Sequence, residues 1–142
     1  MTSLAEKSQQ SLQAAEVLMR SNLYPSTINR AYYGFHQYML HILFRKMGKT
    51  QEDFDNDLNA YGFGTHSLAW NLVGPAFAKN KPKDVADREW RNEFKWLQEQ
   101  VASFKKIRTE ADYKEITIQQ EVAHDWINKA ISMINLLNKG FK

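Results

Sequence analysis

The chain contains no cysteine, only three prolines and six glycines among its 142 residues, and no long apolar run. Without cysteine it can form neither a disulfide nor a thiolate metal site. The few prolines and glycines argue against a disordered chain or a fibrous repeat. No segment reaches the roughly 18 consecutive apolar residues of a membrane-spanning helix, and the first residues lack the apolar stretch of a signal peptide. These absences predict a cytoplasmic protein without membrane contact.

The residues that are present indicate one globular domain covering positions 1–142. Hydrophobic residues make up 43% of the chain and aromatic residues 13%, which is enough for a substantial core. The net charge of +3 is too small to imply a nucleic-acid partner by itself. Neither an internal repeat nor a long linker divides the sequence.

Hydrophobic periodicity and capping signals predict only helices. Ser3 and Glu6 fit a capping box, Pro25 suits a first helical turn, and Gly48 suits a helix end. Thr50 opens a short acidic helix, and a turn is expected at 61–64. The longer helices are expected at 4–20, 25–47, 66–79, 85–110 with Asp84 as cap, and from Thr117 to Gly140. The predicted fold is all-α, an up-and-down bundle of four main helices plus one or two short helices.

The stretch INRAYYGFHQYML, residues 28–40, contains two adjacent tyrosines inside a predicted helix. Tyr32 falls in line with Ile28 and Phe35, so it is expected in the core. Tyr33 lies about 100° further round the helix, on a polar seam with Arg30, Asn29 and Gln37. Gly34 costs about 1 kcal/mol relative to alanine in a helix, and close approach of another helix, within the chain or from a second subunit, explains it.

The sequence offers no pattern for a metal, a cofactor or a nucleophile. His36 and His41 are five residues apart, about 140° round a helix, whereas a metal pair needs i,i+4 spacing. The segment GFGTH at 62–66 lacks the lysine and the preceding strand of a phosphate-binding loop. No serine or threonine has an evident base partner. We therefore expect no metal, no cofactor and no covalent catalysis.

Residues 79–108 are locally basic, with nine lysines and arginines against five acidic residues, interleaved with four aromatic residues. This composition suits contact with RNA or phosphate. It equally suits a bundle helix with an apolar stripe and a solvated charged face, on which residues such as Asp87 and Arg91 pair along the helix. Both interpretations remain open at this point.

Three segments in a fixed order, NRAYYGFHQ, GTHS and RTEADY, resemble the HEPN superfamily, in particular its small bacterial and archaeal members. The resemblance covers nearly the whole chain. It implies a helical bundle of four or five helices that is commonly dimeric. Many such proteins are paired with a minimal nucleotidyltransferase, some pairs act as toxin and antitoxin, and others are ribonucleases or are proposed to bind nucleotides.

The catalytic members of this superfamily use an arginine followed, after four to six residues, by a histidine. Arg108 matches the arginine by position, but no histidine follows it at that spacing. Arg30 and His36 have the spacing on a different helix, about 240° apart, which we interpret as coincidence. His36 also comes one residue earlier than the histidine of the related motif, whose place is taken by Gln37.

The resemblance therefore predicts a non-catalytic, dimeric binding module for a nucleotide, RNA or a partner protein such as a nucleotidyltransferase. Arginine suits phosphate, and tyrosine can stack on a base. The alternative is a metal-independent ribonuclease of toxin type, in which Arg108 stabilises the transition-state charge and His66 is a displaced general base. A purely structural dimer is a third alternative. The expected binding residues are Arg30, Tyr33, His66, Arg108, Asp112 and Tyr113.

Overall fold

The computed structural model describes residues 2–62 and 64–142, so the turn expected at 61–64 includes one position outside the described residues. The described part of the chain forms six α-helices and one π-helical turn, and contains no strand. This confirms the predicted all-α helical bundle. The helices are α1 Leu4–Arg20, α2 Tyr24–His41, α3 Gln51–Tyr61, α4 Thr65–Lys79, α5 Asp87–Tyr113 and α6 Gln120–Gly140; the π-helical turn is η1 Ile42–Lys46.

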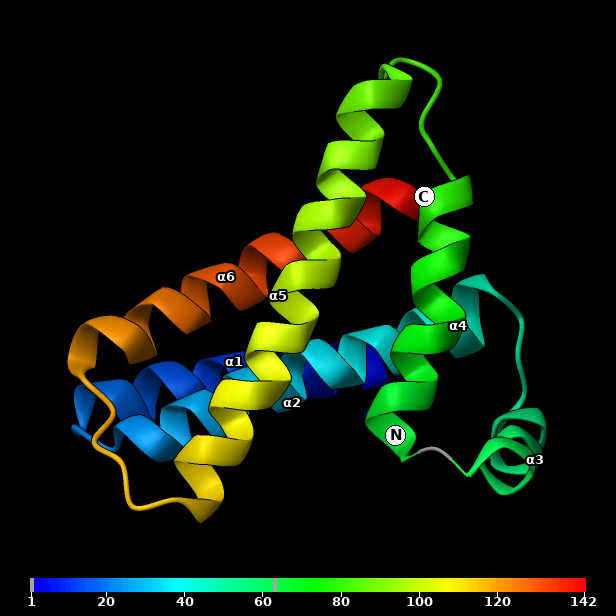
Figure 1. Ribbon diagram of the computed structural model, residues 1–142. Coiled ribbons are helices and arrows are strands. Elements are labelled where there is room, and N and C mark those ends of the chain that lie inside the picture. The colour runs from blue at the N-terminus through cyan, green and yellow to red at the C-terminus, as the bar shows by residue number, and fades with distance from the viewer. Residues whose placement is uncertain (1, 63) are drawn as a thin grey trace.

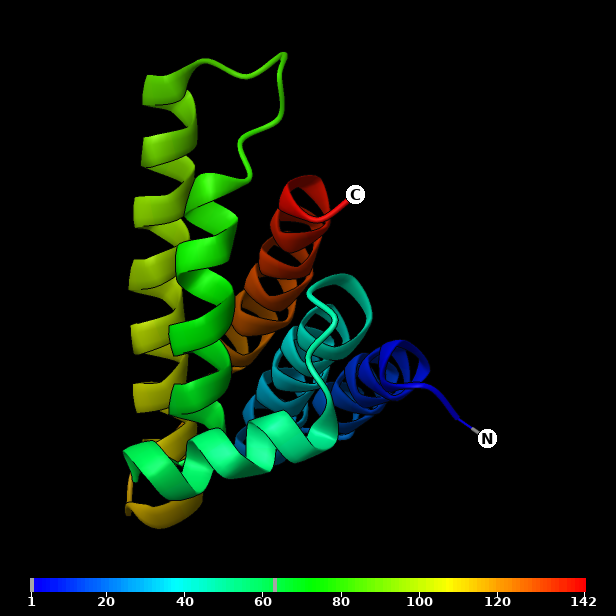
Figure 2. The ribbon, with the colours of Figure 1, turned by 90° about the vertical axis from the view of Figure 1, so that its right-hand side faces the viewer.

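Helix α2 is the centre of the arrangement. It packs against α1, α6, α5 and α4. Figure 1 shows α1, α2 and α6 as one group of neighbouring helices, with α5 crossing that group steeply. In Figure 2 helices α4 and α5 run side by side as a second pair, and α3 lies next to the lower end of α4. Residues on one face of α2 therefore meet residues from both α4 and α5.

Three of the predicted helix ends have the expected local chemistry. The side chain of Ser3 accepts a hydrogen bond from the backbone of Glu6, and Thr50 forms a complete capping box with Asp53. Gly48 follows the π-helical turn with φ of 72°, a backbone conformation that glycine adopts without strain. The helix that was expected to continue to position 47 thus ends in a wider turn, in which Met47 donates to the carbonyl of Ile42.

Two helices begin later than predicted. Asp84 does not cap α5, whose N-cap is Ala86, and Thr117 does not cap α6, whose N-cap is Gln119. In each case a buried apolar residue separates the expected cap from the helix: Val85 is 7% exposed and Ile118 is 6% exposed. Burying this side chain holds the preceding segment in a non-helical conformation, and this tertiary contact overrides the local capping signal.

Gly34 is explained by a close approach within the chain. A Cβ atom at this position would lie 3.0 Å from Cγ of Leu12 and 3.3 Å from the backbone oxygen of Ser8, both on α1. The hydroxyl of Ser8 also donates a 2.6 Å hydrogen bond to the carbonyl oxygen of Gly34. The absence of a side chain therefore lets α1 and α2 pack closely, as the first of the two expected explanations requires.

The two tyrosines of α2 lie on different faces of the helix, as predicted. Tyr32 is buried at 4% exposure, whereas Tyr33 is partly exposed. Gln37, one turn after Tyr33, is also partly exposed, and its side-chain amide lies 2.7 Å from the hydroxyl of Ser11 on α1. Helix α1 therefore supplies a polar partner to this seam.

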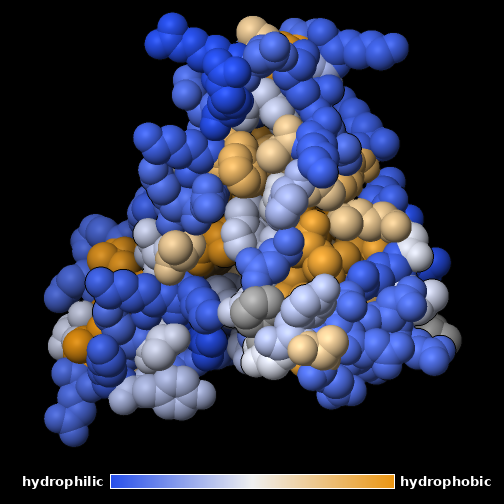
Figure 3. All heavy atoms as spheres, turned by 45° about the vertical axis from the view of Figure 1, so that its right-hand side comes forward, coloured by the Kyte–Doolittle hydropathy of each residue, from blue (hydrophilic) through white to orange (hydrophobic). Residues whose placement is uncertain are grey.

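The surface is mostly hydrophilic, with apolar side chains reaching it in places. Figure 3, turned toward the α4 side, shows apolar residues visible at the centre between charged ones. Within the described residues no helix is both long enough and apolar enough to cross a membrane.

Candidate functional site

Side chains from three helices meet where α4 and α5 cross α2. On α2, residues 29, 30, 32, 33 and 36 lie within two turns, at spacings that bring i,i+3 and i,i+4 neighbours together. Helix α4 contributes a residue of its first turn, and α5 contributes two from its last turns. We call this group the Arg108 cluster: Asn29, Arg30, Tyr32, Tyr33, His36, His66, Arg108 and Asp112.

Aromatic rings form one half of the Arg108 cluster. The guanidinium carbon of Arg30 lies 5.1 Å from the ring centre of Tyr33, which in turn lies 5.5 Å from the ring of His66. The ring of His66 stacks on Tyr32 at 5.0 Å. The guanidinium carbon of Arg108 is 4.9 Å from the centre of the Tyr32 ring. Both arginines therefore have cation–π contacts with adjacent tyrosines.

Polar contacts form the other half and close the group into a ring. Nη1 of Arg108 lies 3.6 Å from a carboxylate oxygen of Asp112, one turn further along α5. The same carboxylate oxygen accepts a 3.1 Å hydrogen bond from the amide nitrogen of Asn29 on α2. The amide oxygen of Asn29 accepts hydrogen bonds of 3.3 and 3.2 Å from Arg30. Each arginine is thus positioned by partners on both sides.

The two histidines lie face to face, and His66 is the one that belongs to this ring of contacts. The ring centres of His36 and His66 are 3.9 Å apart and their planes differ by 29°. His36 is 5% exposed, whereas His66 at the start of α4 is partly exposed. Two imidazoles at this distance repel each other if both are charged, so the geometry favours at least one neutral ring.

The surroundings oppose protonation of both rings. The pKa of His36 is lowered to about 3, mainly by burial and to a smaller extent by His66 and the Arg108 guanidinium. Burial, Arg108 and then Lys105 lower the pKa of His66 to about 4. Burial raises the pKa of the Tyr32 hydroxyl, and the charge of Arg108 opposes this effect. At neutral pH the positive charges of the Arg108 cluster are therefore its arginines, beside neutral imidazoles.

Five of the six binding residues expected from the sequence lie in the Arg108 cluster. These are Arg30, Tyr33, His66, Arg108 and Asp112. Tyr113 follows Asp112 at the end of α5, and its side chain is 77% exposed.

Three members of the Arg108 cluster are not among the binding residues expected from the sequence. Tyr32 was assigned to the core alone, Asn29 only to a polar seam, and His36 to a coincidental match. The i,i+4 relation between Tyr32 and His36 was a signal, because it places both rings on one face of α2. The contact with His66 has no counterpart in the local sequence.

The basic segment at 79–108 behaves mainly as a bundle helix. Trp90 and Phe104 are buried, at 2% and 0% exposure, and therefore belong to the core. Asp87 was expected to pair with Arg91, but it lies 3.6 Å from Nζ of Lys81. Lys81 also donates to the carbonyls of Pro82 and Val85, so it holds the preceding loop against the start of α5.

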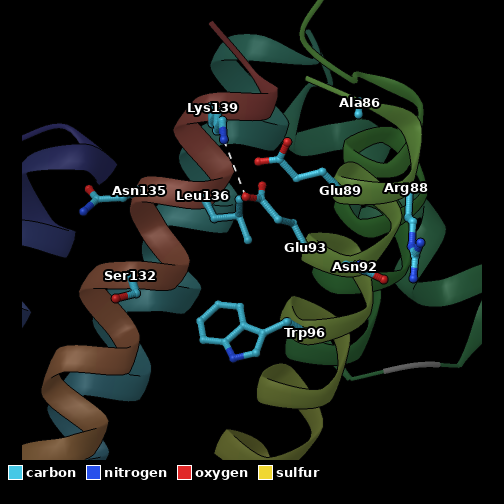
Figure 4. Close-up of a pocket in the computed structure, with 10 residues that line it drawn as sticks. All are labelled: Ala86, Arg88, Glu89, Asn92, Glu93, Trp96, Ser132, Asn135, Leu136 and Lys139. Carbon is cyan, nitrogen blue, oxygen red and sulfur yellow. Dashed lines mark ion pairs between the residues drawn. The ribbon is translucent and has the colours of Figure 1, made fainter. Parts of the chain in front are cut away.

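A pocket of about 840 Å³ lies away from the Arg108 cluster, between α5 and α6. Figure 4 shows Trp96 of α5 pointing toward α6, and Lys139 and Glu93 joined across the pocket by an ion pair of 3.5 Å. Its rim includes two acidic and two basic side chains, Glu89, Glu93, Arg88 and Lys139. These charges balance, so the pocket has no net charge to select a ligand.

Among the described residues no three histidine or carboxylate side chains are grouped as a metal site would require. The fold and the cluster together define an all-α bundle with an arginine, histidine and tyrosine site where two helix layers cross. No family model, no curated protein and no solved structure matches the chain.

Proposed function

We propose that this protein is a non-catalytic binding module of the HEPN type, and that the Arg108 cluster binds a phosphate group of a nucleotide or an RNA strand. The observation that carries the proposal is the environment of the Arg108 side chain, which is mostly buried and incompletely hydrogen-bonded. Its side chain is only 14% exposed, and its ion-pair distance to Asp112 is 3.6 Å. Its Nε is buried without a hydrogen-bond partner among the described residues. A phosphate oxygen would provide the acceptor that this donor lacks.

The second arginine and the neutral rings support the same ligand class. Arg30 belongs to the same ring of contacts as Arg108, so the Arg108 cluster carries two guanidinium groups. Burial is the main cause that lowers the pKa values of His36 and His66, and the positive charge of Arg108 also lowers both. That positive charge favours anions. Tyr33, partly exposed beside both His66 and Arg30, offers a ring on which a base can stack.

The convergence of the three sequence segments supports the HEPN resemblance. The segments NRAYYGFHQ, GTHS and RTEADY lie on α2, at the start of α4 and at the end of α5. Each of them contributes side chains to the Arg108 cluster. By the same resemblance, the proposal includes a cytoplasmic homodimer that acts beside a partner protein such as a nucleotidyltransferase.

Binding of single-stranded RNA tests the proposed site. We expect Arg108→Ala to weaken binding of a fluorescein-labelled RNA oligonucleotide about 10- to 150-fold, because a hydrogen bond to a charged group contributes about 1.5–3 kcal/mol. Arg91→Ala is the matched control, since Arg91 is an exposed arginine on the same helix outside the Arg108 cluster. Fluorescence anisotropy at constant salt measures both variants. Equal affinities of the two variants would contradict the proposal.

The homodimer is tested in solution. Light scattering behind a sizing column, at micromolar concentration, is expected to give twice the chain mass of 16.6 kDa. The reason is that apolar side chains such as Val17, Leu23 and Ile131 are exposed on the single chain, and a second copy would cover such surface. A single species with the mass of one chain would refute this part of the proposal.

The stacked histidines beside Arg108 favour a second candidate function, a metal-independent ribonuclease. In that function Arg108 would stabilise the developing charge on phosphorus, and His66 would act as general base. However, an effective general base has a pKa near the working pH, and the pKa of His66 is lowered to about 4. The arrangement thus contains groups that could take part in catalysis, but the low pKa of His66 makes it a poor general base.

A cleavage assay separates the two functions. The purified wild-type protein is expected to cleave single-stranded RNA no faster than Arg108→Ala or His66→Ala, with or without magnesium or zinc. Loss of an effective general acid or base typically removes a factor of about 10² to 10⁴ in rate, which lowers a slow ribonuclease to background. If the wild type degrades RNA and both variants abolish the cleavage, the ribonuclease function replaces the binding module.

A further inference from the structure

A second pocket, of about 450 Å³, adjoins the Arg108 cluster between α2, α4 and α5. Tyr32 and His66 line this pocket and also belong to the cluster, so the two share a wall. The volume falls within the range of about 300–1,000 Å³ that is usual for small-molecule sites. A ligand bound to Arg108 could therefore extend directly into this space.

The lining of this second pocket combines aromatic surface with amide groups. Trp70 of α4 offers a partly exposed indole, and its ring stacks on Phe94 with the centres 6.3 Å apart. Asn71 and Gln98 are exposed and line the pocket from α4 and α5. An aromatic face supports a planar ring, and a primary amide presents both a donor and an acceptor. These are the groups that recognise the face and the edge of a nucleobase.

A basic residue connects the pocket with the phosphate position. Lys105 lines the pocket, and its Nζ lies 2.7 Å from the hydroxyl of Ser67. Lys105 and Arg108 are three residues apart on α5, so their Cβ atoms lie about 5–6 Å from each other on one face of the helix. Lys105 therefore places a positive group on the pocket wall, one helical turn from Arg108, which lies outside the pocket lining.

We propose that the pocket between α4 and α5 holds the nucleobase of a mononucleotide unit whose phosphate is bound at Arg108. This inference rests on the proposed function and names its ligand more closely. The base would stack against Trp70 or His66, with its edge toward Asn71 and Gln98. The ligand class is a nucleoside monophosphate, free or at the end of an RNA strand.

The experiment compares ribose 5-phosphate with adenosine and uridine monophosphates, titrated by NMR to millimolar concentration. Ribose 5-phosphate tests the phosphate position alone, and the gain in affinity with a base tests the pocket. Stacking of one base changes affinity roughly 5- to 150-fold, and we expect a gain in this range. Arg108→Ala should weaken all three ligands, because they share the phosphate.

The variant Ala102→Trp is designed to fill the pocket. Ala102 is an exposed residue of its lining, and the neighbouring Ser103, which is also exposed, does not line it. Ala102→Trp is expected to abolish the gain from the base and to leave ribose 5-phosphate binding unchanged, whereas Ser103→Trp should preserve both. Should Ala102→Trp fail to fold, Gln98→Ala replaces it, with an expected several-fold loss for the nucleotides alone.

The outcomes distinguish this inference from the proposed function. Binding of ribose 5-phosphate with the same affinity as the nucleotides would overturn the base pocket and leave the phosphate site intact. A gain from the base that survives Ala102→Trp would likewise overturn it. Absence of binding by all three ligands, together with an RNA affinity insensitive to Arg108→Ala, would overturn both.

Discussion

Replacement of Tyr32 by alanine is expected to lower the free energy of unfolding by about 3–5 kcal/mol, the usual cost of truncating a buried aromatic side chain. Tyr32 is 4% exposed, and its ring meets the ring of Phe104 edge-on at 5.3 Å. Its removal would also take away one of the two stacking partners of His66 given above and the ring that contacts Arg108. Few substitutions in this chain disturb the core and the Arg108 cluster together.

Tyr33→Ala is the matched control for Tyr32→Ala. The two positions are adjacent on α2 and carry the same residue, but Tyr33 is partly exposed. We expect Tyr33→Ala to cost about 1 kcal/mol, mainly from its contact with Arg30. Urea unfolding measures this difference, because the midpoints of the two variants report their stabilities when their transitions have the same slope. Equal losses would show that the two faces of α2 have been assigned wrongly.

Acidification to pH 5 is expected to destabilise the wild-type protein by about 2 kcal/mol more than the variant His36→Phe. The pKa of His36 is lowered from its ordinary value of 6.5 to about 3, chiefly by burial. The unfolded chain therefore binds a proton at this residue below pH 6.5 that the folded chain does not. Stability from His36 is complete above pH 6.5, declines as the pH falls, and is lost at about pH 3.

The comparison of pH 7 with pH 5 avoids most carboxylate titration, whose ordinary pKa values lie near 4. Phenylalanine preserves an aromatic ring against His66, and Nδ1 of His36 has no hydrogen-bond partner within the described residues to lose. His124→Phe is the control, because His124 is exposed on α6. Urea unfolding of the wild type and the two variants at both pH values gives the six free energies needed. If wild type and His36→Phe lose equal stability, His36 is not held neutral by the fold.

The positions of the helices, and which face of each is buried, could be predicted from the sequence because they follow from local interactions. A period of 3.6 residues assigns Tyr32 to the core and Tyr33 to a more exposed face. Ser3, Thr50 and Gly48 mark helix ends through hydrogen bonds and dihedral angles within a few residues. Where local signals failed, at Asp84 and Thr117, burial of the next apolar residues decided the boundary.

The contacts between residues of different helices depend on how the helices pack together. Asn29 and Asp112 are 83 residues apart in the chain, and they become hydrogen-bonded because α5 crosses α2. His66 stacks on His36 for the same reason, since the packing of α4 against α2 determines where its first turn lies. Such contacts depend on how whole helix surfaces fit together, which is summed over many weak interactions. No local sequence pattern reveals this long-range fit. The sequence therefore indicated most of the members of the Arg108 cluster, and the packing of α4 and α5 against α2 brought them into contact.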